Sequence, residues 1–219
     1  MQSEASAPSH LLSSRLREAT QSVHTMVEGA DFIKKLFQGS CTHSEYYLYL
    51  WSFQKIYESL EAALSENLNH PAISPIFFQE ILRLSALNED LKGWSSHRSE
   101  VSDEIQGAVS KYQNYLLQLA KSNPELLVAH AYVRYLGDLS GGQVFAKVLS
   151  RRFPETNFFN FYAFPDSNVA DLKKSFRDGL DQVGVLLTDH GKFCEEAITA
   201  FQFNGDVFRA LGVSARTGA

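Results

Sequence analysis

The 219-residue sequence has little of what marks several large classes of protein. It has no membrane-spanning run, which would need roughly 20 apolar residues, because its longest apolar stretch, 126–133, is short and contains His130. It has no excess of positive charge: a formal net charge of −5 disfavours a general nucleic-acid binder. Its two cysteines, Cys41 and Cys194, form no C-x-x-C pattern and predict free thiols in the cytoplasm or another reducing compartment.

What the sequence does have is an ordinary globular composition and helical periodicity. Hydrophobic residues make up 44% and charged residues 21%, which predicts a folded chain. Apolar residues recur at helical spacing, while the alternation of exposed strands is scarce. We therefore expect one all-α domain over 10–211, which is within the reach of a single core, with a flexible leader at 1–9 and a flexible tail at 212–219. Membrane association is expected only if a parent chain continues beyond the C-terminus.

Start and stop signals place the individual helices. Thr42 and Glu45 have the spacing of a capping box, and Asn123 before Pro124 is typical of a helix start. Gly29 and Gly39 are suited to helix ends. The expected helices cover 12–27, 32–37, 43–64, about 76–86, 103–121, 124 to beyond 144, 168–187 and 188–211, with 88–102 either irregular or a short helix and a loop.

The most informative segment is ELLVAHAYVRYLGDLSGGQVFAKVL at 125–149. Gly137, Gly141 and Gly142 interrupt a strongly helical stretch, where each glycine costs about 1 kcal/mol relative to alanine. Gly137 and Gly141 lie one turn apart, so they remove side chains from the same face. This pattern predicts tight helix packing, a kink, or close approach of the backbone to a flat ligand.

Polar residues beside these features suggest a ligand site without proving one. Arg134 and Asp138 adjoin the glycines, yet alone they are equally typical of an exposed ion pair. His24 borders an apolar helical stripe, with Glu28 one turn further on. A neutral imidazole can hold a heme iron and leave the opposite position open, and a carboxylate can orient the ring, but a lone histidine is more typical of a hydrogen-bonded core residue. His130 is interpreted as structural, because it lies on the helix that would have to leave space for oxygen.

Two segments together resemble the heme oxygenase family. They are LREATQSVHTMVEGADF at 16–32 and PELLVAHAYVRYLGDLSGGQV at 124–144, and the YLGDLSGGQ core of the second is highly specific. The stretch YLYLWSFQKIYESLEAAL at 48–65 resembles the family's long helix. The resemblance runs from Leu11 to Leu211. It implies a helical fold that holds heme between a proximal helix and a glycine-kinked distal helix.

The resemblance also implies site residues. His24 is the implied axial ligand of the heme iron, with Glu28 behind it, and Asp138 is the implied organiser of distal water. The supporting polar network would contain Arg134 and Tyr57. The residues implied to lie against the porphyrin are Gly137, Gly141 and Gly142. The residues implied to meet the heme propionates are Arg17, Tyr132, Lys173 and Arg177, of which Arg17 replaces a lysine common in animal relatives.

The activity implied by the resemblance is oxidative cleavage of heme, as both substrate and cofactor, to biliverdin, carbon monoxide and ferrous iron. Oxygen and electrons are required, and the absence of flavin, nicotinamide and iron–sulfur motifs indicates an external reductase or ferredoxin. The protein is expected to be a monomer that meets this redox partner. A non-catalytic heme carrier or sensor would keep His24 but would not need Asp138, whereas a heme-free enzyme of the thiaminase-like branch would not need His24.

Overall fold

The computed structural model describes residues 11–187 and 189–217, and this part of the chain is helical with no strand. The predicted leader and the last two residues lie outside the described residues. The α-helices are α1 Leu12–Glu28, α2 Asp31–Gln38, α3 His43–Glu66, α4 Leu84–Gly93, α5 Asp103–Ser122, α6 Leu127–Ser140, α7 Gly142–Arg152, α8 Val169–Leu186 and α9 His190–Thr217. Short 3₁₀ turns lie at Ser74–Ile76, Gln79–Ile81, Ser95–His97, Pro124–Leu126 and Asn160–Tyr162.

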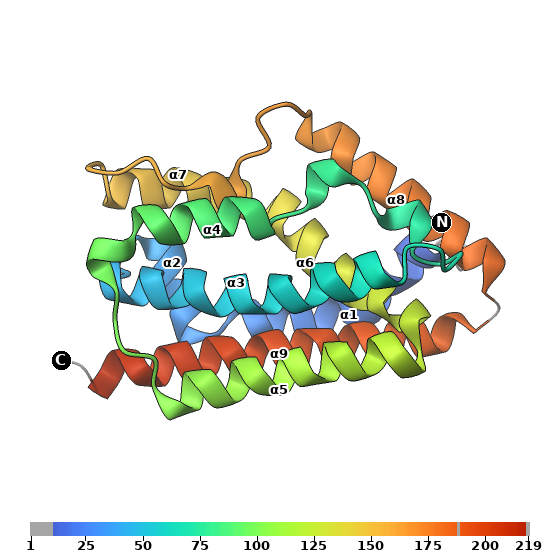
Figure 1. Cartoon of the computed structure of the whole chain (residues 1–219), viewed down its shortest axis with the longest axis horizontal. Coiled ribbons are helices and arrows are strands. Elements are labelled where there is room, and N and C mark those ends of the chain that lie inside the picture. The colour runs from blue at the N-terminus through green and yellow to red at the C-terminus, as the bar shows by residue number, and fades with distance from the viewer. Residues whose placement is uncertain (1–10, 188, 218–219) are drawn as a thin grey trace, which may run out of the picture.

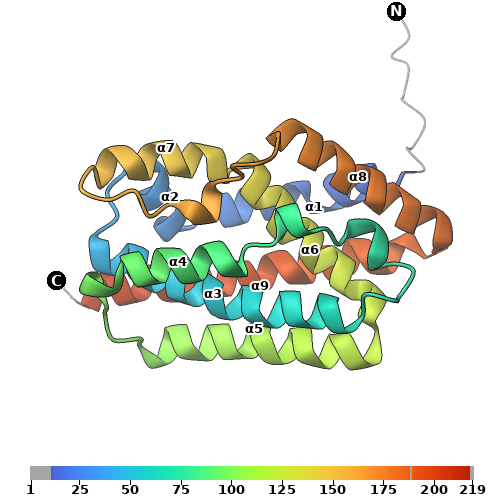
Figure 2. The same cartoon turned by 45° about the horizontal axis from the view of Figure 1, so that its top comes forward.

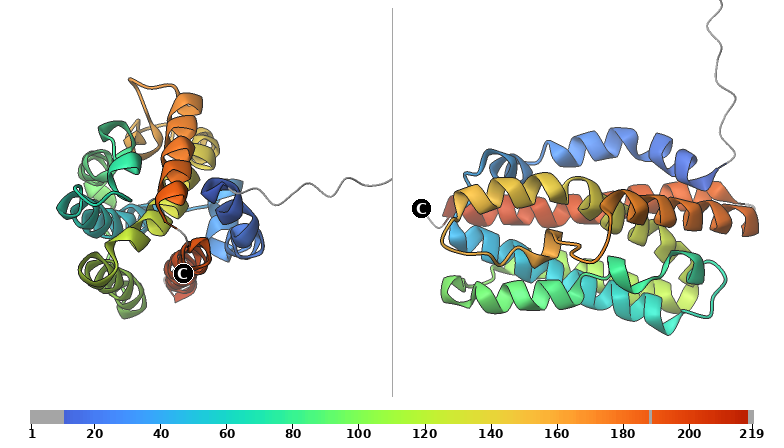
Figure 3. Two further views of the ribbon diagram at one scale, coloured as in Figure 1. Left: turned by 90° about the vertical axis from the view of Figure 1, so that its right-hand side faces the viewer. Right: turned by 90° about the horizontal axis from the view of Figure 1, so that it is seen from above.

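The long helices α3, α5 and α9 run along the longest axis of the molecule, with α1 behind them (Figure 1). Helix α6 crosses this array obliquely, and it passes through the middle of the molecule in the end view of Figure 3. Helix α9 packs against α1, α5 and α6. Helices α2 and α7 lie side by side at one end, while α8 packs on α1 at the other (Figure 2). These helices enclose a cavity, which α1 and α2 line on one side and α6 and α7 line on the other.

Local sequence signals explain the ends of several helices as predicted. The Thr42 side chain accepts from the backbone N–H of Glu45, and the Glu45 carboxylate accepts from that of Thr42, which forms the capping box. Gly39 ends α2 with a φ of 64°, a left-handed conformation that favours glycine. The side chain of Asn168 caps α8 by accepting from Ala170 N at 2.8 Å. The prediction of an all-α fold is confirmed.

The predicted helix at 76–86 is wrong. Two 3₁₀ turns occupy most of that stretch, and α4 begins only at Leu84. A carboxylate from another helix fixes this start: Glu61 Oε1 on α3 accepts from the backbone N–H of Arg83 at 2.6 Å and of Leu84 at 3.2 Å. Because this cap comes from a residue far away in the sequence, no local signal marks it.

The distal segment also differs from the prediction of one helix continuing past Val144. Helix α6 ends at Ser140 and α7 begins at Gly142, so the chain changes direction at Gly141 (Figure 1). The expected cap at Asn123 is also missing: its side chain makes no capping bond, and Pro124 opens a 3₁₀ turn. The helix proper starts at Leu127, after that turn.

The last helix runs to Thr217, so its predicted end at Leu211 is too early. Burial of Val207, Phe208 and Leu211 holds this part of α9 against the rest of the molecule. Gly212 does not stop the helix, and its backbone comes near the start of α2 at Phe32. The predicted cap residue at position 188 lies outside the described residues.

One buried carboxylate holds the segment that connects α7 to α8. Asp90 on α4 is fully buried and accepts from the backbone N–H groups of Asn160 at 2.9 Å and Phe161 at 2.8 Å. The next residue, Tyr162, donates from its hydroxyl to that of Tyr49 at 3.0 Å. Tyr49 and Tyr162 both line the cavity between α1 and α6, so Asp90 helps to position two residues of its wall.

Candidate active site

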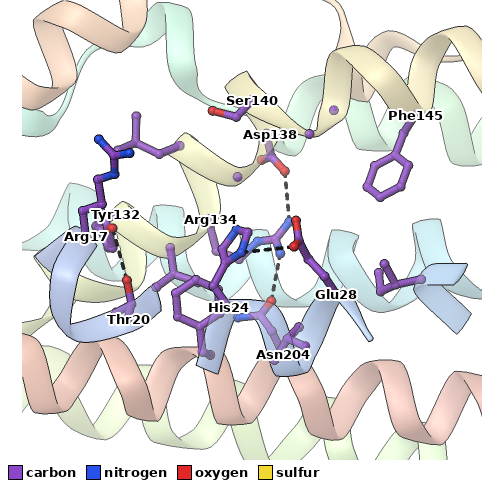
Figure 4. Close-up of a pocket in the computed structure, with 18 of the residues that line it drawn as sticks. Arg17, Thr20, His24, Glu28, Tyr132, Arg134, Asp138, Ser140, Phe145 and Asn204 are labelled. Atoms are coloured by element: carbon purple, nitrogen blue, oxygen red, sulfur yellow. Dashed lines mark hydrogen bonds and ion pairs between the residues drawn. The ribbon is translucent and has the colours of Figure 1, made fainter. Parts of the chain in front are cut away.

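A cavity of about 720 Å³ lies between α1 and α6, with walls from α2, α7, α8 and α9. This volume is within the range of roughly 300–1,000 Å³ that is usual for sites of small molecules and cofactors. Figure 4 shows His24 and Glu28 on α1 below the cavity and Asp138 on α6 above it. We call the α1 side proximal and the α6 side distal.

The proximal side carries one histidine with an available ring nitrogen. The side chain of His24 is 47% exposed, and its Nδ1 lies 3.4 Å from Glu28 Oε2, one helical turn away. The ring of Phe201 on α9 meets the imidazole edge to face, with centroids 5.4 Å apart. Within the described part of the chain no side chain bonds His24 Nε2. The predicted pair is therefore present, and its geometry leaves Nε2 for a ligand in the cavity.

The distal side carries a buried ion pair. Asp138 and Arg134 are 4% and 7% exposed, and Arg134 Nη2 donates to Asp138 Oδ1 at 3.0 Å (Figure 4). The hydroxyl of Tyr57, on α3, donates to the other carboxylate oxygen. Arg134 Nε donates to that hydroxyl at 3.3 Å, and the guanidinium lies 4.2 Å from the ring centroid of Phe53. Asp138 and the two residues predicted for its supporting network, Arg134 and Tyr57, are thus brought together.

Burial and neighbouring charges have opposite effects on the pKa values of Asp138 and Arg134. Burial raises the pKa of the Asp138 carboxyl above its ordinary value, although the charge of Arg134 and the hydrogen bond from Tyr57 oppose the rise. Burial by itself would lower the pKa of Arg134, but Tyr57 and Asp138 keep it above its ordinary value. Asp138 therefore combines a fixed position with a stronger hold on a proton than an exposed aspartate has.

The glycines fall into two kinds. A Cβ on Gly137 would meet no atom within 4 Å, and one on Gly141 would meet only the carbonyl oxygen of Gly137 at 3.5 Å. Both line the cavity, so the bare backbone forms a shelf that side chains would fill. A Cβ on Gly142 would instead lie 2.7 Å from Tyr162 Cδ1. The open backbone at Gly137 and Gly141 has room for a flat macrocycle, whereas Gly142, which also lines the cavity, has no room for a side chain beside Tyr162.

This difference predicts opposite effects for two alanine substitutions. Gly137→Ala should stabilise the ligand-free protein by up to about 1 kcal/mol through helix propensity, while weakening heme binding because the methyl group occupies the shelf. Gly142→Ala should lower the free energy of unfolding by about 1–3 kcal/mol through overpacking. Urea unfolding and heme titration of both variants measure these effects. Equal destabilisation by the two substitutions would contradict the distinction.

At the end of the cavity where α1 and α8 meet, three of the four residues predicted for propionates line the wall. They are Arg17, Tyr132 and Arg177. Burial raises the pKa of the Tyr132 hydroxyl, and the nearby charges of Arg17 and Arg177 oppose this. The hydroxyl also lies 3.4 Å from Thr20 Oγ1. Lys173 is not among the lining residues: α8 approaches α1 in its later turns, where Asp181 Oδ1 accepts from Ser13 N at 2.9 Å.

His130 does not reach the cavity, in agreement with its predicted structural role. It is fully buried, with Nδ1 3.0 Å from the Tyr112 hydroxyl and Nε2 2.7 Å from Glu196 Oε1.

Sequence reasoning missed several residues that line the cavity from α2, α7 and α9. They are Ile33, Phe37, Phe145, Phe201, Asn204 and Phe208. Among these, Asn204 had a signal, since it is a polar residue on an otherwise apolar helical stripe.

No helix among the described residues is long and apolar enough to cross a membrane.

The family model for heme oxygenase matches residues 10–210. Heme oxygenase 1 from Homo sapiens is 35% identical over 205 residues, covering 91% of this chain and 71% of that protein. Heme oxygenase 1 from Gallus gallus is 37% identical over 216 residues, with 94% and 72% covered.

Solved structures agree with these sequence matches. The heme oxygenase of Leptospira interrogans superposes with a TM-score of 0.81 at 33% identity, covering 90% of this chain and 98% of that one. Heme oxygenase-1 of the cyanobacterium Synechocystis, solved in complex with heme, gives a TM-score of 0.82 at 29% identity, with 94% and 98% covered. The similarity therefore extends over nearly the whole chain in both sequence and fold.

Proposed function

The chain belongs to the heme oxygenase family of heme-degrading enzymes, and from this premise we propose how its own residues bind heme and cleave it. Heme lies in the cavity between α1 and α6 and is both substrate and cofactor. The observation that carries the proposal is the arrangement of three features around one space: the available Nε2 of His24, the bare backbone at Gly137 and the buried Asp138. When bound, heme supplies the iron at which oxygen is reduced.

His24 Nε2 is the proposed axial ligand. Glu28 faces the other ring nitrogen, so it favours the tautomer with the proton on Nδ1 and leaves the Nε2 lone pair for the metal. Phe201 limits rotation of the ring by its edge-to-face contact. A neutral imidazole at this position would hold the heme iron from the proximal side only.

Asp138 is the proposed proton donor through distal water. Its raised pKa keeps a proton on the carboxyl to a higher pH than usual, and Arg134 and Tyr57 fix both carboxylate oxygens. Asp138 lines the cavity beside Gly137 and Gly141, where the backbone carries no side chain. The Asp138 carboxyl would therefore hold a water molecule and supply a proton at a fixed place on the distal side of the cavity.

The basic end of the cavity is the proposed propionate site, with Arg17, Arg177 and Tyr132 as its donors. The propionates are the charged groups of heme, so their position decides which meso carbon faces the distal shelf. The structure does not place Lys173 at the cavity, and we do not include it in this site.

Replacing Arg177 with alanine should therefore change the product pattern, and Lys173→Ala is the matched control on the same helix. Heme affinity should fall only modestly, since exposed charge contacts contribute about 0.2–1 kcal/mol. The larger effect should be a mixture of biliverdin isomers, because heme can rotate in the pocket. Chromatography of the products measures it. A single unchanged isomer from Arg177→Ala would show that apolar packing sets the orientation, and an equal mixture from Lys173→Ala would show that Lys173 also holds a propionate.

Electrons are proposed to come from an external reductase or ferredoxin. The sequence has no flavin, nicotinamide or iron–sulfur motif of its own. The proposed working unit is a monomer. Unpaired cysteines support a reducing compartment, such as the cytoplasm.

A heme carrier or sensor is the alternative to an enzyme with these residue roles, and gas release separates the two. Purified protein loaded with heme and supplied with air and a reductant should release carbon monoxide in about one equivalent per heme. A carrier or sensor would release none. The buried Asp138–Arg134 pair favours the enzyme, since simple heme storage has no use for a proton donor on the open side.

A further inference from the structure

The end of the cavity formed by α2 and α7 contains two tyrosines that the proposed mechanism does not use. Tyr49, on α3, and Tyr162, in the 3₁₀ turn before α8, both line the cavity and are 3% and 2% exposed. We call them the tyrosine pair. The wall beside them is aromatic: the ring centroid of Phe145 lies 4.5 Å from that of Phe37 and 6.0 Å from that of Tyr162. Buried hydroxyl groups in such surroundings need hydrogen-bond partners.

The hydrogen bond within the tyrosine pair leaves one donor unused. The Tyr162 hydroxyl donates to the Tyr49 hydroxyl at 3.0 Å, so the Tyr49 oxygen is the acceptor. Burial raises the pKa of Tyr49 to about 12, although the charge of Arg134 opposes the rise, so the phenol keeps its own hydrogen at neutral pH. No atom of the described residues accepts that hydrogen. Because Tyr49 lines the cavity, the acceptor is a molecule bound there.

The place of this donor relative to heme decides what can accept from it. Figure 4 shows Arg17 on one side of His24 and Phe145 on the other. Heme that places its propionates at Arg17 and Arg177 therefore turns its opposite edge toward Phe145 and the tyrosine pair. In intact heme this edge carries only vinyl, methyl and meso C–H groups, and none of these is a hydrogen-bond acceptor. Heme by itself therefore leaves the Tyr49 hydrogen without a partner.

Opening of the ring at this edge creates the missing acceptor. The proposed reaction removes the meso carbon as carbon monoxide and leaves a carbonyl oxygen on each of the two ring carbons that flanked it. We propose that Tyr49 donates a hydrogen bond to a carbonyl oxygen of the ring-opened product, and that Tyr162 is the positioning residue that turns the Tyr49 hydroxyl toward it. The cavity thus distinguishes biliverdin from heme by one buried hydrogen bond. This rests on the proposed function, which supplies the product, but binding of the product is measured without turnover.

The test compares ligands of the heme-free protein in three variants. Tyr49→Phe removes the donor but keeps the ring, and Tyr162→Phe removes the hydroxyl that orients it. Tyr46→Phe is the matched control: Tyr46 is buried on the same helix with its ring stacked on that of Tyr49. Among the described residues its hydroxyl has no hydrogen-bond partner, and it does not line the cavity.

The ligands are heme and two biliverdin isomers, one cut opposite the propionates and one cut between them. Only the first isomer carries its carbonyl groups at the edge that faces the tyrosine pair. We expect Tyr49→Phe to bind this isomer roughly twofold to tenfold more weakly than wild type, as for one neutral hydrogen bond, and to bind heme and the second isomer as wild type does. In infrared spectra of the bound first isomer, the carbonyl stretch should move to higher frequency, because the hydrogen bond that weakens the C=O bond is lost.

Tyr162→Phe should show both changes to a smaller extent, and Tyr46→Phe should show neither. Wild-type affinity and carbonyl frequency in Tyr49→Phe would overturn the proposal, as would an equal loss of affinity for heme or for the second isomer. An unchanged carbonyl frequency in Tyr162→Phe would refute its positioning role. A wild-type protein that shows this preference for the first isomer but cleaves no heme would uphold the carbonyl site while refuting the proposed function, so the two failures are distinguishable.

Discussion

His24→Ala is expected to yield a protein that still takes up heme but lacks the axial nitrogen and has lost nearly all turnover. The apolar walls and the basic end of the cavity remain, so binding persists. Without the imidazole, the iron loses its only proposed protein ligand. The rate of heme cleavage should therefore fall by more than about a hundredfold, because loss of a residue that only supports a metal ligand usually costs about 10–100-fold. Electron paramagnetic resonance of the ferric heme complex measures the loss of the axial nitrogen. The rate at which bound heme is degraded measures the loss of turnover.

Two further variants sharpen this result. His130→Ala should keep the axial nitrogen signal, since both ring nitrogens of His130 face protein groups away from the cavity. Glu28→Gln should keep the signal and lose no more than about tenfold in rate. Added imidazole should restore turnover to His24→Ala by filling the vacated position. Loss of the axial nitrogen in His130→Ala, with its retention in His24→Ala, would refute the assignment of the ligand.

Asp138→Asn should separate heme binding from heme cleavage. The amide keeps the shape of the side chain and an acceptor for Arg134, so the heme affinity should stay close to wild type, although loss of the negative charge beside Arg134 lowers the free energy of unfolding. The carboxyl proton is lost, and biliverdin formation should fall by about a hundredfold or more, in line with the usual effect of removing a general acid. Single-turnover spectra with an excess of reductant measure the yield of biliverdin.

Asp138→Ala is the less informative substitution, because it removes the oxygen atoms that accept from Arg134 and Tyr57 as well as the negative charge. Breaking a buried ion pair in this way costs about 3–5 kcal/mol of stability. Tyr57→Phe is a useful companion: it removes the hydroxyl that donates to Asp138 while keeping the ring and the charge pair. A normal biliverdin yield from Asp138→Asn would contradict the proposed role of the carboxyl.

Helices that rely on local signals were predictable from the sequence, whereas those fixed by distant residues were not. The Thr42–Glu45 box and the Gly39 end are encoded within a few residues, and they form as expected. The start of α4 depends on Glu61, which is 22 positions before the backbone N–H that it caps. The turn at Gly141 likewise depends on packing of Gly142 against Tyr162.

The same division applies to the candidate site. His24 with Glu28 and Arg134 with Asp138 are pairs at i,i+4, so helical periodicity was enough to place their members side by side. Spacing also put Lys173 beside Arg177, but it could not show that only the second reaches the cavity. Asn204, which accepts from Arg134 Nη1, is 70 positions away in the sequence, and this contact follows only from the way α9 packs on α6.

One titration tests the central claim, that the cavity between His24 and Asp138 both binds heme and cleaves it. Heme is added to the purified protein until the absorbance of the complex no longer increases, and a reductant is then supplied in air while spectra are taken. We expect saturation at one heme per chain, followed by loss of the heme bands and growth of a biliverdin spectrum. A complex that forms with the same stoichiometry but keeps its heme bands under reductant and air would contradict the claim and identify the protein as a carrier or sensor.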